Sequence, residues 1–295
     1  MKKKADLFRV YALLTIVLTI LYFYLNLFFP RLIPPSLRLG MIRKPFNLLI
    51  VGTDITFDSV SGKPIPNLEG RADTIILAHI DPVKQEVNLV SIPRDTLVAI
   101  PGYGQQKINA SSVYGGIPLL EESVSGLTGK KIDHYLEVKP AAVTKLVDLL
   151  GGVTLLVEKD MRYVDRAQKL DINLKEGWQK LSGKKAHEYI RFRHDLYGDI
   201  GRIERQQNFL KALIKTSAKP SNIIKAPFAI SLALQEIKTD LPLTQTIRLL
   251  NFSRTISFGD IKTHTISGES SLVEGAGSVW LINKNDLNRI IKEFF

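Results

Sequence analysis

Residues 46–51 form an apolar run that ends in Gly52, and this run constrains the fold more than any other feature of the chain. A short apolar run bounded by a turn residue is typical of a strand buried inside a sheet. Residues 74–80 and 87–92 predict two further strands, and Asp81-Pro82 between them predicts a hairpin. The core of the protein is therefore predicted to contain a β-sheet.

Helices are predicted to interleave with these strands. Later strands are predicted at 132–138, 153–157 and 261–266, and helices at 140–150, 202–216, 221–238, 244–254 and 284–295. Gly151-Gly152 is expected to end the first of these helices. The predicted fold class is α/β, an α/β/α sandwich around a central mixed β-sheet.

An uncharged apolar run of bilayer-spanning length covers residues 10–29. Lysines precede it, and the bulky aromatic residues at its end argue against a cleavable signal peptide. The predicted order is a short cytoplasmic basic segment at 1–9, a transmembrane helix at 10–29, a juxtamembrane linker at 30–45 and one domain at 46–295. A short basic N-terminus usually stays inside, so the domain is expected outside the cytoplasm.

The composition narrows the function classes. The net charge of +11 indicates acidic partners, namely nucleic acid, an anionic membrane surface or phosphorylated ligands. The chain has no cysteine, which excludes disulfides and thiolate nucleophiles. The histidines lack zinc-ligand spacing, and the esterase and P-loop motifs are absent from the sequence. DNA binding conflicts with an external domain.

The segment 191–207 reads RFRHDLYGDIGRIERQQ and is unusually rich in arginine. Arg191 and Arg193 alternate, so in an extended strand both would point the same way. Arg202 and Gln206 are four residues apart and would share a helix face, and Asp199 lies where that helix would begin. Guanidinium groups at a helix N-terminus suit phosphate or pyrophosphate. Taken alone, the segment fits a salt-bridged surface strip equally well.

Other charged residues are predicted at one edge of the sheet. Asp54 follows the first strand, Asp73 precedes the second, and Arg94 follows the third. A hairpin between strands two and three makes Asp73 and Arg94 neighbours, and Asp54 joins them if strands one and three are parallel. Two aspartates that converge among cationic residues form a hard oxygen site for Mg²⁺ or Mn²⁺. Arg71 is expected on the face of Asp73, with Lys107 within reach; a lone Asp73–Arg94 ion pair is the structural alternative.

Five motifs in this order resemble those of the LytR-CpsA-Psr family. They are LLIVGTD (48–54), RADT (71–74), SIPRDT (91–96), KINAS (107–111) and the arginine-rich segment 191–207. The resemblance implies a cell-membrane protein with one membrane span and a catalytic domain on the extracytoplasmic side. Its implied activity is transfer of a glycopolymer from a polyprenyl-pyrophosphate carrier to a peptidoglycan acceptor, forming a phosphodiester. A hydrophobic tunnel for the polyprenyl chain is part of the implied fold.

The resemblance also implies roles for individual residues. Asp54 and Asp73 are the implied metal ligands for Mg²⁺ (or Mn²⁺), and Asp73 and Arg94 the implied catalytic pair. The implied pyrophosphate contacts are Arg71, Arg94, Lys107, Arg191, Arg193, Asp199, Arg202 and Gln206. The implied partners are the lipid-linked glycopolymer, peptidoglycan and the membrane, without nucleic acid.

Two other functions share these residues: a polyprenyl-pyrophosphate phosphatase and a non-catalytic lipid-binding regulator of the cell envelope. A lipid carrier needs an apolar trough, and several apolar side chains in the later helices are candidates for its walls. These are Leu210, Leu213, Ile214, Ile223, Ile224, Leu232 and Leu234. Core packing is the commoner use of such stripes.

Overall fold

A computed structural model describes residues 15, 17–22, 24–26, 33, 42–53, 70–165, 170–192, 198–223, 225 and 237–295. A six-stranded sheet runs through the middle of these residues, in the order β11-β6-β1-β2-β3-β12. Its strands are β11 (Ile237–Thr239), β6 (His134–Val138), β1 (Phe46–Thr53), β2 (Ala72–Asp81), β3 (Glu86–Ser91) and β12 (Ile261–Thr265).

The strand directions define one functional edge of the sheet. β1 pairs with β6 in parallel and with β2 antiparallel. β3 pairs antiparallel with β2 and in parallel with β12. Strands β1, β3, β6 and β12 therefore end at the same edge, where β2 begins. The predicted mixed sheet is confirmed, and β1 and β3 run parallel, which is the condition under which Asp54 was expected beside Asp73 and Arg94.

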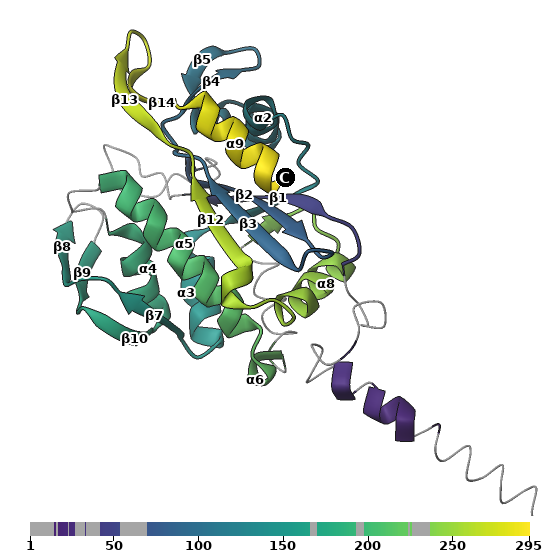
Figure 1. Ribbon diagram of the computed structural model, residues 1–295. Coiled ribbons are helices and arrows are strands. Elements are labelled where there is room, and N and C mark those ends of the chain that lie inside the picture. The colour runs from purple at the N-terminus through teal and green to yellow at the C-terminus, as the bar shows by residue number, and fades with distance from the viewer. Residues whose placement is uncertain are drawn as a thin grey trace, which may run out of the picture.

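Helices cover both faces of the sheet, as Figure 1 shows. Leu49 and Val51 of β1 belong to the core beneath α2 (Ala110–Thr128) and α9 (Lys284–Phe294). Phe46 and Leu48 point to the opposite face and share a core with residues of α5 (Gly198–Ser217) and α8 (Leu243–Ser253). This alternation along β1 follows from the period of two residues in a strand. The layers form the predicted α/β/α sandwich.

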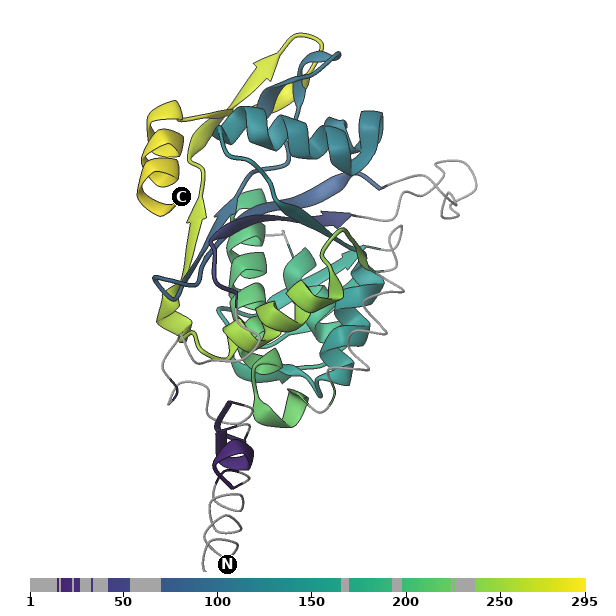
Figure 2. The same cartoon turned by 90° about the vertical axis from the view of Figure 1, so that its right-hand side faces the viewer.

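A third apolar core includes residues of α5. Helices α3 (Pro140–Leu149) and α4 (Gly183–Arg191) pack there against two small antiparallel sheets. These sheets pair β7 (Val153–Val157) with β10 (Gly177–Leu181), and β8 (Met161–Asp165) with β9 (Leu170–Leu174). Figure 2 shows these elements on the side of the sheet opposite α2. The cavity described below lies between this core and the central sheet.

Two hairpins and two short helical turns complete the described fold. The hairpins are β4 (Leu97–Ile100) with β5 (Gly104–Lys107), and β13 (Gly268–Val273) with β14 (Gly277–Ile282). The short turns are α6 (Pro220–Ile223) and η3 (Phe258–Asp260). The backbone N–H of Trp280 in β14 donates to the Asp95 carbonyl at 2.8 Å, which anchors the segment after Arg94.

Two sequence-based expectations need correction, and one helix was not predicted. Residues 237–238 were expected in a helix over 221–238, but they belong to β11, because β6 offers them an open edge to pair with. Arg191 does not lie in a strand; it is the last residue of α4. Helix α2 was not predicted, because Gly115 and Gly116 have non-helical backbone angles and interrupt its apolar periodicity.

The N-terminal predictions lie largely outside the described residues, because 1–14, 16, 23, 27–32 and 34–41 are not among them. Residues 17–22 and 24–26 are helical, with the Asn26 side chain donating to the Tyr22 carbonyl at 2.9 Å. Within the described part of the chain, no helix combines the length and apolar character that crossing a membrane requires. The predicted span, linker and orientation stay predictions.

Candidate functional site

A cavity of about 440 Å³ lies between the central sheet and helices α3, α4 and α5. Most of its wall is apolar. The apolar wall comprises Ile50, Ile76, Leu136, Val138, Pro140, Ala142, Val143, Leu146, Tyr163, Leu170, Ile190, Phe209, Leu210, Leu213 and Ile237. Its volume lies within the usual range of ligand sites, roughly 300–1,000 Å³.

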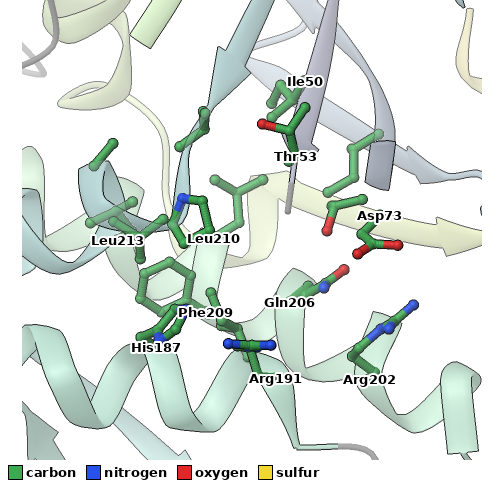
Figure 3. Close-up of a pocket in the computed structure, with 18 of the residues that line it drawn as sticks. Ile50, Thr53, Asp73, His187, Arg191, Arg202, Gln206, Phe209, Leu210 and Leu213 are labelled. Atoms are coloured by element: carbon green, nitrogen blue, oxygen red, sulfur yellow. The ribbon is translucent and has the colours of Figure 1, made fainter. Parts of the chain in front are cut away.

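Polar residues gather at one end of this cavity, as Figure 3 shows. Asp73, Arg191, Arg202 and Gln206 lie near one another there, whereas Leu213 lies toward the other end. Arg94 also belongs to the lining. We call these five polar residues, Asp73, Arg94, Arg191, Arg202 and Gln206, the cationic mouth. The cavity thus suits a molecule with a charged head and a long apolar part.

Asp73 and Arg94 meet because β2 and β3 form a hairpin. Arg94 Nη1 lies 2.5 Å from Asp73 Oδ1, with the two side chains 22% and 25% exposed. Asp73 is the second residue of β2, rather than preceding the strand, and Arg94 follows the end of β3. The predicted adjacency of the two residues is confirmed. A partly exposed ion pair of this kind remains accessible to a ligand in the cavity.

Asp95 links the mouth to the β4–β5 hairpin. Its Oδ1 lies 3.1 Å from Lys107 Nζ, and its Oδ2 lies 3.7 Å from Arg94 Nε. Asp95 therefore pairs locally, with its neighbour Arg94 and with the end of β5. Neither Lys107 nor Arg71 is among the residues that line the cavity, and Arg71 is exposed. Their predicted contact with pyrophosphate stays a prediction.

The helical arginines reach the mouth from two elements. Arg191 ends α4, whereas Arg202 and Gln206 lie one turn apart on α5, as their spacing predicts. The N-terminal end of α5 carries the positive end of the helix dipole, which favours an anion beside it. Asp199 lies in the first turn of α5, and its side chain is outside the described part.

Two of the predicted site residues cannot be placed. Arg193 and Asp54 lie outside the described residues, at 193–197 and 54–69. Asp54 directly follows Thr53, which lines the cavity. Arg193 follows Phe192, the residue after Arg191 of the cationic mouth. Their predicted roles therefore stay predictions.

Arg205 holds the backbone beside Arg191, a role that the sequence reasoning missed. Arg205 is 2% exposed, and its Nε and Nη2 donate to the Phe192 carbonyl at 3.2 and 2.8 Å. Its Nη1 donates to Glu158 Oε1 at 2.9 Å, and Tyr189 Oη donates to Glu158 Oε2 at 3.2 Å. Burial raises the pKa of Tyr189, so its hydroxyl keeps the proton that it donates. The network fixes the end of α4.

Gln207 fixes α5 to the functional edge of the sheet, and sequence reasoning also missed it. Its Nε2 lies 2.8 Å from Ser91 Oγ, 3.1 Å from the His264 carbonyl and 3.1 Å from Thr265 Oγ1. These acceptors stand at the ends of β3 and β12. A buried amide with three such neighbours strongly restricts the helix, so Gln206 and Arg202 are held in register with the strands.

Helical spacing could have identified further lining residues. His187 lies four residues before Arg191 on the same face of α4. On α5, Phe209 lies three residues after Gln206 on the same face. A search for the helical periodicity of the arginines would have found these positions. The strand expected at 191–193 concealed that signal.

The oxygen atoms at the mouth suit a hard divalent cation. The Asp73 carboxylate and the hydroxyl residues Thr53 and Thr74 line the same cavity. Among the residues that the structure describes, no group of three or more His, Cys, Asp or Glu side chains gathers as a metal site. Mg²⁺ commonly takes one or two carboxylates and completes its shell with phosphate oxygens and water. The donor set therefore fits Mg²⁺ or Mn²⁺ held jointly with a phosphorylated ligand.

This combination of fold and cavity defines a class of proteins: α/β domains with an apolar cavity whose polar end lies at the carboxyl ends of their strands, the usual place for a ligand in such sheets. The model of the LytR_cpsA_psr family matches residues 36–294. This chain belongs to the LytR-CpsA-Psr family, as its five motifs predict.

Named relatives agree with this membership. The regulatory protein MsrR of Staphylococcus aureus (strain COL) is 32% identical over 237 residues, covering 77% of this chain and 69% of MsrR. The polyisoprenyl-teichoic acid–peptidoglycan teichoic acid transferase TagU of Halalkalibacterium halodurans is 35% identical over 202 residues, covering 68% of this chain and 62% of TagU. The crystal structure of B. subtilis TagV matches with a TM-score of 0.73 at 27% identity, over 85% of this chain and 96% of TagV.

Proposed function

We propose that this protein transfers a glycopolymer from a polyprenyl-pyrophosphate carrier to peptidoglycan and leaves a phosphodiester link. The observation that carries the proposal is the apolar cavity that ends in the cationic mouth. The relative TagU is named as a transferase that moves teichoic acid from a polyisoprenyl carrier to peptidoglycan.

The cavity would hold the two parts of such a donor separately. The polyprenyl chain would lie against the apolar wall, where each buried methylene contributes about 0.8 kcal/mol. The pyrophosphate would lie against Arg191 and Arg202, whose guanidinium groups can form paired hydrogen bonds with phosphate oxygens. Binding energy from the lipid would thus position the phosphorus atoms at the mouth.

The transfer would proceed by displacement at phosphorus. A hydroxyl oxygen of the acceptor forms a bond to the phosphorus that carries the glycopolymer, and the bond from this phosphorus to the bridging oxygen breaks. Polyprenyl monophosphate leaves with the electron pair of that bond. Asp73 takes the hydroxyl proton, and Arg94 holds the Asp73 carboxylate beside the reacting atoms. The mouth arginines stabilise the negative charge that develops on the phosphate oxygens.

A divalent cation fits this arrangement. Mg²⁺ or Mn²⁺, held by Asp73 and Asp54 when bound, would neutralise charge on the phosphate oxygens. Arg191, Arg202 and Gln206 would orient the pyrophosphate with or without the cation.

The proposed location is the outer face of the cell membrane, with one span at 10–29. An uncharged run of this length supports the anchor, and several of the described apolar side chains within it are exposed to solvent. These exposed side chains are Val17, Leu18, Ile20, Leu21 and Tyr24. The carrier lipid would share the same bilayer, so the anchor would keep enzyme and donor together.

To test the proposal, the purified full-length protein is incubated with a polyprenyl-pyrophosphate oligosaccharide, a peptidoglycan oligosaccharide and Mg²⁺. The expected products are a phosphodiester between the two saccharides and polyprenyl monophosphate, both identified by mass spectrometry. Release of phosphate products without the phosphodiester would instead indicate a phosphatase. Donor binding without any turnover would indicate a lipid-binding regulator.

A further inference from the structure

We infer that the outer face of the β7–β10 sheet is a second membrane contact, which rests in the lipid headgroup region and binds an anionic bilayer. We call this face the β7–β10 face and define it by Thr154, Leu156, Trp178 and Lys180. The inference rests on the proposed membrane location and adds a surface outside the cavity.

The first observation is an exposed apolar pair. Trp178 is 74% exposed and Leu156 is 48% exposed, and the two are directly opposite in the antiparallel β7–β10 pairing. The opposite face of the same sheet packs against the core, because Val153, Leu155 and Val157 are buried there beside α3 and α4. Trp178 and Leu156 therefore lie together on the surface and do not contribute to the core.

The second observation is the chemistry around this pair. Lys180 lies two residues after Trp178 on the same face and opposite Thr154. Tryptophan favours the interface between lipid and water, because its ring is apolar and its N–H needs a polar partner. A lysine near an anionic bilayer adds about 1 kcal/mol of attraction. Trp, Leu and Lys side by side, on a chain of net charge +11, match a lipid headgroup surface.

The third observation is the position of the β7–β10 face on the molecule. In Figures 1 and 2 the N-terminal helical residues leave the domain at the end where α6 lies. Asn26 is tied to that end, because its carbonyl accepts from Arg254 Nη1 at 3.5 Å. Lys225, just after α6, donates to the Leu149 carbonyl at 2.9 Å and so joins α6 to the turn before β7. The apolar anchor and the β7–β10 face thus belong to one end of the domain.

A second contact would restrict how the domain turns on its anchor. One span alone leaves the domain free to rotate and tilt, whereas two separated contacts fix which side faces the bilayer. The cavity opens between α4, α5 and the sheet, so a fixed tilt would hold its mouth at a constant height above the lipid. Donor lipids would then meet the mouth in one orientation.

The chain provides its own probes, because Trp178 and Trp280 are its two tryptophans. Trp280 lies on β14, away from α6 in Figure 1. The full-length Trp280→Phe variant reports on Trp178 alone, and Trp178→Phe reports on Trp280 alone. Each variant is incorporated into vesicles of phosphatidylcholine and phosphatidylglycerol, with or without brominated acyl chains, and flotation measures incorporation.

We expect Trp178 emission to shift to shorter wavelength in vesicles and to fall when the lipids are brominated, and Trp280 emission to remain unchanged. Replacing phosphatidylglycerol with phosphatidylcholine should reduce the quenching of Trp178. A chain that floats with the vesicles while Trp178 stays unquenched would overturn the inference alone. A chain that does not float would overturn the proposed membrane location and the inference together.

Discussion

The Asp73–Arg94 pair is the residue-scale feature on which the proposed chemistry depends most. Because each side chain is about a quarter exposed, the pair contributes at most about 1 kcal/mol to stability. Its proposed effect on the transition state is larger, since losing one charge-stabilising group costs about 100- to 1,000-fold in rate. Substitutions at these two positions should therefore lower the transfer rate strongly while changing the stability of the fold little.

We predict that Asp73→Asn and Arg94→Gln each lower transfer at least about 100-fold while the unfolding temperature changes by a few degrees or less. Steady-state transfer assays and thermal unfolding of the same preparations provide the measurement. Arg289→Gln is the matched control, because it removes an arginine that pairs with Asp286 on α9, far along the chain from the mouth. Transfer rates equal to wild type in both mouth variants would contradict the assignment.

Arg205 tests whether positioning, rather than contact with the donor, matters beside Arg191. We predict that Arg205→Lys destabilises the fold by about 1–3 kcal/mol, because lysine cannot replace both bonds to the Phe192 carbonyl and the bond to Glu158. Denaturant unfolding measures the loss.

The same Arg205→Lys variant should lower the maximal transfer rate more than it raises the apparent KM of a short-chain donor. This split follows because Arg191 would be mispositioned rather than removed. An unchanged maximal rate in a destabilised variant would show that Arg205 is purely structural.

At the scale of elements, the contact between α3 and α4 positions the arginine end of α4. Gly183 begins α4, and a side-chain carbon there would lie 2.1 Å from the Thr144 carbonyl oxygen and 2.7 Å from Asp148 Oδ2. The Gly183 N–H donates to Asp148 Oδ1 at 2.7 Å. Only glycine fits this approach without moving one helix away from the other.

We predict that Gly183→Ala destabilises the fold by about 3 kcal/mol, the upper end of the usual cost of overpacking. Gly126→Ala is the matched control, because Gly126 lies on an exposed face of α2 with open space around it. That control should stabilise α2 by roughly 0.5–1 kcal/mol. Equal stabilities of the two variants in urea titrations would contradict the close α3–α4 contact.

The sequence predicts the elements near the mouth better than those around the apolar wall. Asp81-Pro82 indicates the β2–β3 hairpin, and that hairpin alone makes Asp73 and Arg94 neighbours. In contrast, Arg205 and Gln207 act through partners 47 and 116 residues away, which no local pattern reveals. Apolar stripes on helices also look the same whether they line a cavity or a core, so the wall could not be separated from ordinary packing.

At the scale of the whole molecule, the C-terminal helix closes over the sheet through aromatic contacts. The His264 ring stacks on Phe294 with centroids 4.0 Å apart, and His79 lies 5.0 Å from the Phe295 ring. Burial, reinforced by Arg289, lowers the pKa of His264, and burial also lowers the pKa of His79. In the folded protein these histidines therefore bind protons only at a lower pH than unfolded histidine does.

The sign of the pH effect follows from these lowered pKa values. Unfolded histidine binds protons below about pH 6.5, whereas folded His264 binds them only at lower pH. The stability from neutral His264 is therefore present above about pH 6.5 and is lost as the pH falls. We predict that His264→Phe, which keeps an aromatic ring against Phe294, loses less stability than wild type between pH 7 and roughly pH 5. If the unfolding temperatures of wild type and of His264→Phe fell equally over this pH range, the prediction would be contradicted.

The fold class was predictable at this scale because strands and helices interleave along the chain. The position of the cavity was not, because it arises where α3, α4 and α5 pack beside the sheet rather than from any single segment. Ala142 illustrates this: it is a plain helical alanine in sequence, yet it lines the cavity from α3. Its neighbour Ala141 is exposed on the same helix. The two positions form a matched pair for testing the cavity.

The most direct test of the proposed lipid-dependent transfer is the dependence of transfer rate on donor chain length in Ala142→Phe and Ala141→Phe. We predict that Ala142→Phe, which places a ring inside the cavity of about 440 Å³, loses transfer from long polyprenyl donors but retains it from donors of one or two isoprene units. Ala141→Phe should behave as wild type with both donors. Undiminished transfer from long-chain donors by a folded Ala142→Phe variant would contradict the claim that this cavity holds the carrier lipid.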